Sequence, residues 1–163
     1  MGYIVRKYEE RDLPELIDIW NSVIEDGVAF PQLEFLNIES GHRHFLSQTY
    51  TGVAVNEATD EIAGLYILHP NNVGRCGHIG NAGYMVKKGI RGKHIGDLLV
   101  KNSVQTAGKY GFKILQFNAV VKSNTHAIDL YIRNGFEQVG VIPNGFLMKN
   151  GNYEDILIFY RNV

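Results

Sequence analysis

The chain has 163 residues, of which 45% are hydrophobic, and this predicts one globular domain, residues 1–163, with a substantial core. The formal net charge is −1 with both signs spread along the chain, which argues against a nucleic-acid partner. The single Cys76 excludes an internal disulfide, the first residues have no apolar signal core, and no eighteen apolar residues run together. We therefore expect a cytoplasmic protein without a membrane partner.

The first half of the chain predicts a strand, two helices and a hairpin. Residues 3–8 form a short strand, and the following helix starts like a capping box, with Asp12 at the cap and Glu15 three residues later. Apolar residues then recur at helical spacing: Leu16, Ile19, Trp20 and Val23. A short second helix is expected over residues 42–49, and residues 51–70 predict two strands around a polar turn.

The second half alternates strands with helices. Apolar runs and turn residues predict four strands, over residues 78–86, 113–121, 136–142 and 153–160. Helical periodicity predicts two helices, over residues 95–111 and 124–135. Because strands come first in a run and then alternate with helices, the fold class is α/β with a mixed sheet.

The stretch IRGKHIGDLL joins a predicted strand to a predicted helix. The first N–H groups of a helix lack internal partners and favour an anion such as phosphate. Gly92 and Gly96 allow close approach, and Arg91 and Lys93 add positive charge, although a tight turn with a solvated basic pair is the simpler alternative. A Walker loop is excluded because His94 follows Lys93, and the upstream glycines, spaced by threes, miss the dinucleotide fingerprint.

A second motif lies in the last predicted helix. Asn124 and Tyr131 are seven residues apart, so both project from one helix face, and the small Ala127 between them leaves a channel. Alternatively, Tyr131 is only a half-buried aromatic of the helix.

These two motifs together resemble the GCN5-related N-acetyltransferase (GNAT) family. The segment Arg91, Gly92, Lys93, His94, Ile95, Gly96 is similar to its pyrophosphate loop, Q/R-x-x-G-x-G/A. Its later coenzyme A segment is matched by Asn124, Ala127, Leu130, Tyr131, Gly135 and Phe136. The resemblance covers residues 80–140. It implies a single-domain GNAT-like fold with a mostly antiparallel sheet, splayed between the fourth and fifth strands, and about four helices.

The resemblance also implies that acetyl-CoA, the co-substrate, binds in the splayed gap. The backbone of Met85 and Val86 would hold the pantetheine and polarise the thioester, and the loop from Arg91 to Gly96 would hold the phosphates. Asn124 would hold the pantetheine arm. His94 replaces a glycine, which we expect to be tolerated with a negative φ because the N–H makes the contact, while its imidazole stays solvated.

The resemblance further implies that Tyr131 gives its proton to the departing thiolate. A phenol with a pKa near 10 keeps that proton at neutral pH and can donate it as the carbon–sulfur bond breaks. Many members of the family use a glutamate in the strand before the loop as a base, but residues 78–86 contain no acid. The base is therefore unassigned, with Glu25, Asp26, Glu34 and His78 as candidates.

Two asparagines are candidates for binding the acceptor substrate. Alternation in KILQFNAVV puts Leu115, Phe117, Ala119 and Val121 on one face and Gln116 and Asn118 on the other, so Asn118 is expected to be a buried amide that needs a partner. Asn81 lies between glycines in the preceding strand. Amides can bind a carboxylate and leave an amine free, although two core asparagines bonded to loop backbone remain the alternative.

A narrower resemblance supports a substrate role. The phrases HIGNAGY and FNAVV and an upstream Phe-Pro loop are similar to acetyltransferases of proline analogues such as azetidine-2-carboxylate, which implies that Asn81, Asn118 and Phe30 contact substrate. The sequence thus predicts an N-acetyltransferase that transfers acetyl directly to a small amine, with no metal. A protein or peptide N-acetyltransferase and a non-catalytic coenzyme A-binding module remain alternatives, and a homodimer remains open.

Overall fold

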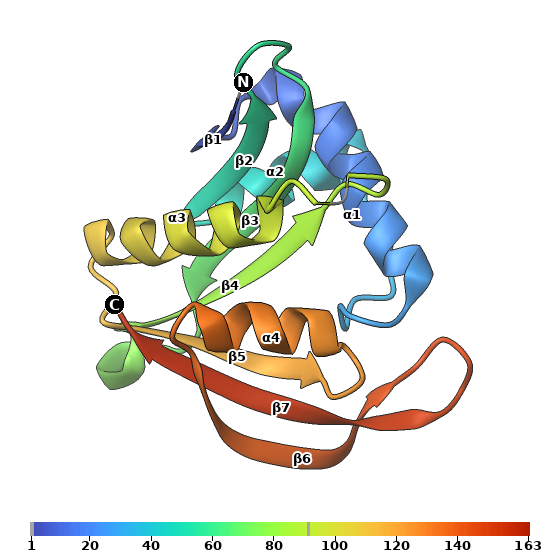
Figure 1. The fold of residues 1–163 in the computed structure, drawn as a ribbon, viewed down its shortest axis with the longest axis vertical. Coiled ribbons are helices and arrows are strands. Elements are labelled where there is room, and N and C mark those ends of the chain that lie inside the picture. Colours follow the sequence, from blue (N-terminus) through green and yellow to red (C-terminus); the bar gives the residue numbers. More distant parts are fainter. Residues whose placement is uncertain (1, 91) are drawn as a thin grey trace.

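The fold is taken from a computed structural model that describes residues 2–90 and 92–163. Its centre is a seven-stranded sheet with the order β1-β2-β3-β4-β5-β7-β6 (Figure 1). The strands are β1 (Tyr3–Lys7), β2 (Tyr50–Asn56), β3 (Ile62–Pro70), β4 (Ile79–Val86), β5 (Ile114–Val121), β6 (Glu137–Leu147) and β7 (Tyr153–Asn162). Neighbours are antiparallel except β4 and β5, which confirms the mixed, mostly antiparallel sheet.

Four α-helices cover the two faces of the sheet. The helices α1 (Leu13–Asp26) and α2 (Ile38–Ser47) lie behind the sheet in Figure 1, and α3 (Ile95–Lys109) and α4 (Thr125–Arg133) lie in front of it. None of these helices, within the part of the chain described, is long and apolar enough to cross a bilayer.

Strand alternation divides the core into two layers. In β3, Leu65 and Ile67 pack with α1 and α2, whereas Tyr66 and Leu68 pack with α3. The predicted apolar face of α1 is confirmed, because Leu16, Ile19 and Trp20 are among its buried residues. These alternations matter for the site because they decide which side chains reach each face.

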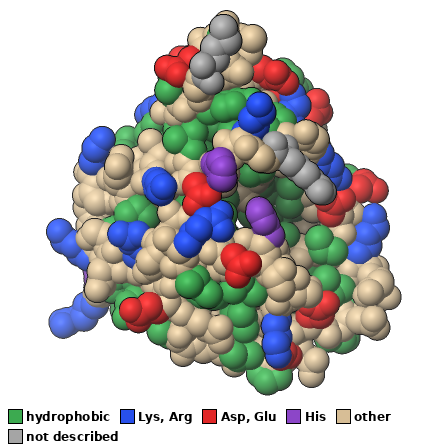
Figure 2. Space-filling model, viewed as in Figure 1, with side chains coloured by type: hydrophobic (Ala, Val, Ile, Leu, Met, Phe, Trp, Pro, Cys, Tyr) green, Lys and Arg blue, Asp and Glu red, His purple; other side chains and the backbone are tan. Residues whose placement is uncertain are grey.

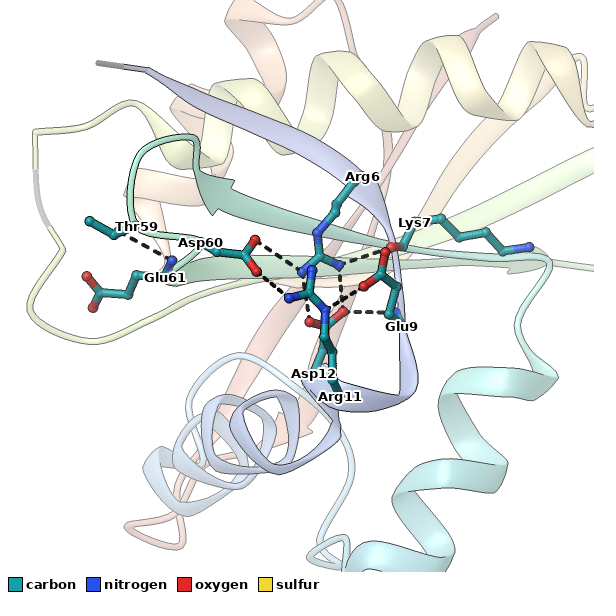
Figure 3. A network of polar contacts seen from close by, with 8 residues as sticks. All are labelled: Arg6, Lys7, Glu9, Arg11, Asp12, Thr59, Asp60 and Glu61. Atoms are coloured by element: carbon teal, nitrogen blue, oxygen red, sulfur yellow. Dashed lines mark hydrogen bonds and ion pairs between the residues drawn. The ribbon is translucent and has the colours of Figure 1, made fainter.

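The start of α1 differs from the predicted capping box. Asp12 precedes α1 but makes no side-chain cap to it; the capping box joins Glu9 and Asp12 one turn earlier. The Asp12 carboxylate instead accepts hydrogen bonds from Arg6, at 2.7 and 2.8 Å, and from the Glu9 N–H at 2.8 Å (Figure 3). Arg11 bridges Glu9 and Asp60 beside it. An ion pair, rather than a helix cap, therefore fixes β1 to α1.

Other boundaries shift for local reasons. The second helix starts at Ile38 rather than at residue 42, because Asn37 and Ser40 cap it reciprocally. The sixth strand continues to Leu147 through an irregularity at Ile142 to Phe146. These two differences lie away from the gap between β4 and β5.

The contact between β4 and β5 is short. Only Ile79 with Ile114 and Gly80 with Leu115 are paired, so the strands diverge beyond these two pairs. The splay predicted between the fourth and fifth strands is thus confirmed. Its rims are the later halves of two adjacent strands.

The alternation predicted for β5 is wrong beyond Phe117. Phe117 pairs with Phe159 but Val120 pairs with Leu157, so β5 carries one extra residue there, a β-bulge. As a result Ala119 and Val121 belong to a separate small core with Phe146 and Ile156, and Val120 joins the core under α3 and α4. The bulge lies on the rim of the splayed gap.

Candidate active site

A cavity of about 1050 Å³ occupies the gap between β4 and β5. It is lined from both faces of the sheet. The loop before α3 and side chains of α4 line it on one face, and Phe30, His69, Asn81 and Asn118 line it on the other. Figure 2 shows basic, acidic and histidine side chains gathered around a hollow with hydrophobic side chains inside. The gap thus connects a charged surface with an interior lined by uncharged amides.

The two sides follow from alternation in β4. Lys87 N donates to Ala63 O of β3, and a Cβ atom added to Gly64 would lie 2.6 Å from the Met85 carbonyl oxygen, so this carbonyl points to β3. Backbone groups alternate along a strand, and those of Val86 therefore point into the gap. Met85 is buried toward α1 and does not line the cavity, whereas Val86 does. The structure thus brings Val86, and not Met85, to the site.

The loop before α3 lines the cavity, but its backbone conformation at His94 differs from the one expected. His94 has φ of +54° and Gly92 has φ of +70°, so the expected negative φ at His94 is wrong. A left-handed residue at the cap turns the chain into α3, which begins at Ile95. The His94 side chain is 84% exposed, as expected for a solvated imidazole. Gly92, Lys93, Ile95 and Gly96 also line the cavity, and Arg91 lies outside the described residues.

An acidic residue in the first turn of α3 is neutralised by α4. Arg133 donates to the two Asp97 carboxylate oxygens at 2.9 and 2.7 Å, and Asn134 Nδ2 donates to one of them at 2.9 Å. These bonds, Arg133 first, lower the pKa of Asp97 to about 2. Sequence reasoning missed this clamp because its partners are far apart in the chain. It keeps the negative charge of Asp97 paired at a helix end suited to an anion.

The two predicted residues of α4 lie at the cavity as expected. Asn124 is the N-cap of α4, where its Oδ1 accepts from Ala127 N at 3.3 Å, which leaves its Nδ2 for a ligand. Tyr131, Asn124 and Ala127 all line the cavity.

The Tyr131 ring lies in an aromatic cluster. Its centroid is 4.6 Å from that of Phe117 and 6.1 Å from that of Tyr84. Burial raises the pKa of Tyr131 above its usual value, so the phenol stays protonated at neutral pH. No hydrogen-bond partner of its hydroxyl is found among residues 2–90 and 92–163. A protonated, uncommitted donor therefore stands at the gap.

A chain of amides forms the opposite wall. Asn81 Nδ2 donates to the backbone carbonyl oxygen of Gln116 at 2.9 Å. The side chains continue the chain, because Gln116 Nε2 donates to Asn118 Oδ1 at 3.0 Å and Asn118 Nδ2 donates to Asn71 Oδ1 at 2.6 Å. The expectation that Asn118 is buried is wrong, because its side chain is exposed to the cavity. The splay removes the neighbouring strand that would have covered it. Sequence reasoning missed the structural part played by Gln116 and Asn71.

Phe30 closes the same side. Its ring is 5.8 Å from that of Trp20, and a Cβ atom at Gly83 would lie 3.0 Å from it. Gly83 therefore lets the Phe30 ring approach β4. Phe30 therefore forms part of the cavity lining beside β4.

The four candidate bases do not line the cavity. Glu25 pairs with Lys149 and Asp26 with Lys88, while Glu34 and His78 are exposed elsewhere. Of the carboxylates in the described residues, only Asp97 lines the cavity, and it is committed to Arg133. A histidine that sequence reasoning did not consider, His69 of β3, lines the cavity beside Asn81.

Comparisons with known proteins agree with this arrangement. Residues 13–136 match the model of the acetyltransferase (GNAT) family. The N-acetyltransferase aca1 of Schizosaccharomyces pombe is 35% identical over 99 residues, which are 60% of this chain and 47% of that protein. The chain thus spans less than half the length of the curated relatives it matches.

Solved structures share the whole fold. A GCN5-related N-acetyltransferase from Kribbella flavida is 28% identical with a TM-score of 0.91, over 99% of this chain and 98% of that chain. A phosphinothricin acetyltransferase from Sinorhizobium meliloti in complex with AcCoA is 20% identical with a TM-score of 0.90, over 100% of this chain and 89% of that chain, and this likeness concerns the fold alone.

The chain belongs to the acetyltransferase (GNAT) family. The matched residues include both strands that border the cavity, β4 and β5.

Proposed function

We propose that the protein transfers the acetyl group of acetyl-CoA directly to the nitrogen of a small amine that carries a carboxylate, an amino acid or an amino-acid analogue. The observation that carries this proposal is the asymmetry of the cavity. Among the described residues, the basic side chains that line it are Lys93 and the Asp97-paired Arg133, and both lie with α3 and α4, whereas the amide wall of Asn81 and Asn118 lies on the other face of the sheet. Acetyl-CoA fits the first side and the acceptor the second.

The fit to acetyl-CoA rests on groups described above. The loop from Gly92 to Gly96, His94 included, offers N–H groups at a helix start, and Lys93 offers positive charge for the phosphates. Val86 offers unpaired backbone to the pantetheine and the thioester carbonyl, and Asn124 offers its Nδ2. Met85 is left out of this set because its carbonyl points to β3.

The reaction would begin with the amine on the acceptor side of the cavity and end with proton transfer from Tyr131 on the acetyl-CoA side. The amine attacks the thioester carbonyl carbon, the carbon–sulfur bond breaks, and the hydroxyl of Tyr131 gives its proton to the departing thiolate. Although burial raises the pKa of Tyr131, the same apolar surroundings raise the proton affinity of a thiolate, which keeps this transfer feasible. No covalent enzyme intermediate is needed.

The choice of acceptor rests on the amide wall. Asn118 uses one amide N–H for its neighbour in the amide chain and keeps the second, which can donate to a carboxylate. This remains so if the amide chain from Gln116 to Asn71 is reversed. Asn81 and Phe30 would enclose the rest of the molecule, as in the acetyltransferases of proline analogues that the sequence resembles.

The test is an acceptor screen that follows acetyl-CoA-dependent thiol release. Free amino acids, cyclic imino acids, their carboxamides and a peptide are compared at equal concentration. We expect turnover with one or more free acids and a large loss in the matching carboxamide. Turnover of the peptide alone would assign a protein or peptide N-acetyltransferase, and binding of acetyl-CoA without any turnover would assign a non-catalytic module.

A further inference from the structure

Among the described residues, His69 is the titratable side chain on the acceptor side of the cavity, whereas the other lining histidines, His94 and His126, belong to the α3 and α4 side. In β3 the odd residues Leu65 and Ile67 face α1 and α2, and His69 continues this face. Its register partner in β4 is Asn81, which is on the same wall. The charged residues that line the cavity, Lys93, Asp97 and Arg133, belong to the α3 and α4 side, so none of them shares this wall.

The hydrogen bond of His69 defines its tautomer. Its Nδ1 lies 2.9 Å from the Pro70 carbonyl oxygen. A carbonyl oxygen only accepts, so a hydrogen bond at this distance requires the proton on Nδ1 and leaves the lone pair on Nε2. The neutral ring is thereby prepared to accept a proton at Nε2.

Asn81 complements this histidine. Its Nδ2 donates to the backbone carbonyl of Gln116, and because that oxygen can only accept, the amide orientation is determined. The Asn81 Oδ1 has no donor within the described parts of the chain and can accept from a substrate N–H. A lone pair on His69 and a carbonyl oxygen on Asn81 thus stand on adjacent strands at one wall.

We propose that His69 Nε2 removes the proton of the substrate ammonium while Asn81 Oδ1 accepts a second N–H and orients the nitrogen. This inference rests on the proposed function and adds the base that the family's usual acidic position does not supply here. The carboxylates of Glu25, Asp26 and Glu34 are not in the cavity, and Asp97 is held by Arg133.

A second histidine lies close to His69. The titratable group that faces it from α2 is His44, which packs edge-on against Trp20 at 4.6 Å. Burial, and then the proximity of His69, lower the pKa of His44, which disfavours the charged form of His44. The neighbours from β4 and β5, Asn81 and Asn118, are uncharged amides.

The protons balance with one acid and one base. The ammonium loses its first proton to His69 Nε2, and the lone pair freed on nitrogen attacks the thioester carbon. As the carbon–sulfur bond breaks, Tyr131 protonates the sulfur, and the second proton lost by the nitrogen restores the phenol. His69 then returns its proton to water. The products are the N-acetyl compound, coenzyme A and one proton.

The experiment compares wild type with His69→Gln and with the exposed control His78→Gln. We expect His69→Gln to lower kcat/KM by about 10²- to 10⁴-fold for an amine that is protonated at neutral pH and to remove the acidic limb of its pH profile. The Kd for acetyl-CoA and the Tm should stay near wild type, and His78→Gln should change neither the rate nor the profile.

An aminooxy acid gives the second arm, because its nitrogen is unprotonated at neutral pH and needs no base before attack. His69→Gln should acetylate it at close to the wild-type rate. An equal loss for both acceptors, or an unchanged pH profile, would overturn the role of His69. If His69→Gln does not fold, nitrogen NMR of the wild-type imidazole decides: a proton on Nε2 rather than Nδ1 refutes the proposal. Wild type inactive on every amine refutes the proposed function instead.

Discussion

Replacement of Asn118 by alanine is the most informative change at the amide wall of Asn81 and Asn118. The side chain is exposed and its two hydrogen bonds run to Gln116 and Asn71, whose freed groups regain water when it is removed. We expect a loss of less than about 1 kcal/mol in the free energy of unfolding. Replacement of a buried core asparagine would lower the free energy of unfolding by more than this. The measured loss therefore distinguishes a substrate-binding role from a structural one.

The effect on the acceptor is expected to be larger. The free N–H of Asn118 can make one hydrogen bond to a carboxylate, and a bond to a charged group is worth about 1.5 to 3 kcal/mol. At 1.4 kcal/mol for each factor of ten, KM should rise roughly 10- to 150-fold for a carboxylate-bearing amine. The Kd for acetyl-CoA should be unchanged because Asn118 lies on the other side of the gap.

The assay is thiol release at varied acceptor concentration, beside a thermal melt of the same preparation. Asn118→Asp is the matched control, because it keeps the size of the side chain and places a negative charge against the carboxylate. It should raise KM further for the acid and little for its carboxamide. A normal KM in Asn118→Ala together with a clearly lower Tm would refute the acceptor role. It would instead support the alternative that Asn118 has a structural role in the core.

Three more changes test other parts of the structure. Tyr131→Phe should lower kcat about 10²-fold or more in steady-state assays, with Kd for acetyl-CoA and Tm unchanged because its hydroxyl is unbonded; an unchanged kcat across neutral pH would remove the general acid. His94→Gly should raise the free energy of unfolding by up to about 1 kcal/mol, since φ is +54°, and calorimetry should show acetyl-CoA affinity within about tenfold; a far greater loss would make the imidazole a phosphate ligand. Asp12→Ala should cost about 2 to 4 kcal/mol, because it leaves Arg6 without its main partner.

The same carboxylate sets a pH dependence. Burial alone would raise the pKa of Asp12, but hydrogen bonds from Arg6 and from the Glu9 N–H outweigh it and lower the pKa. A lowered folded pKa means that the stabilisation is complete above the unfolded value of about 3.9 and is lost as pH falls through the folded pKa. Urea melts of Asp12→Ala should therefore show a flatter acid limb than wild type, and parallel limbs would contradict this role.

Local patterns in the sequence predicted the parts of the site that depend on short spacing. The loop before α3 is one continuous segment, and Asn124 and Tyr131 are two helical turns apart, so short-range patterns were enough to single them out. The left-handed φ of His94 was not predicted, because glycine is the residue that most clearly indicates this conformation in a sequence.

Features that depend on pairing between distant strands were missed. The bulge in β5 reverses the side of Ala119 and Val121, and it arises from the register with β7 rather than from the residues of β5 alone. Similarly, the partnership of His69 with Asn81 exists only because β3 and β4 lie side by side. The sequence around His69 therefore does not indicate a site, because the pairing of β3 with β4 has to be known first.

The short parallel contact between β4 and β5 divides the sheet into two blocks, β1 to β4 and β5 to β7, that are joined through the backbone at only two residue pairs. The core under α3 and α4 also joins the two blocks, so the link between them is weak only in its backbone pairing. In the function proposed above, a thioester arm bound to Val86 of β4 would add a further link across the gap. We therefore expect the domain to become more rigid when acetyl-CoA binds and less rigid when coenzyme A leaves. The rate of coenzyme A release should then depend on how readily the two blocks separate.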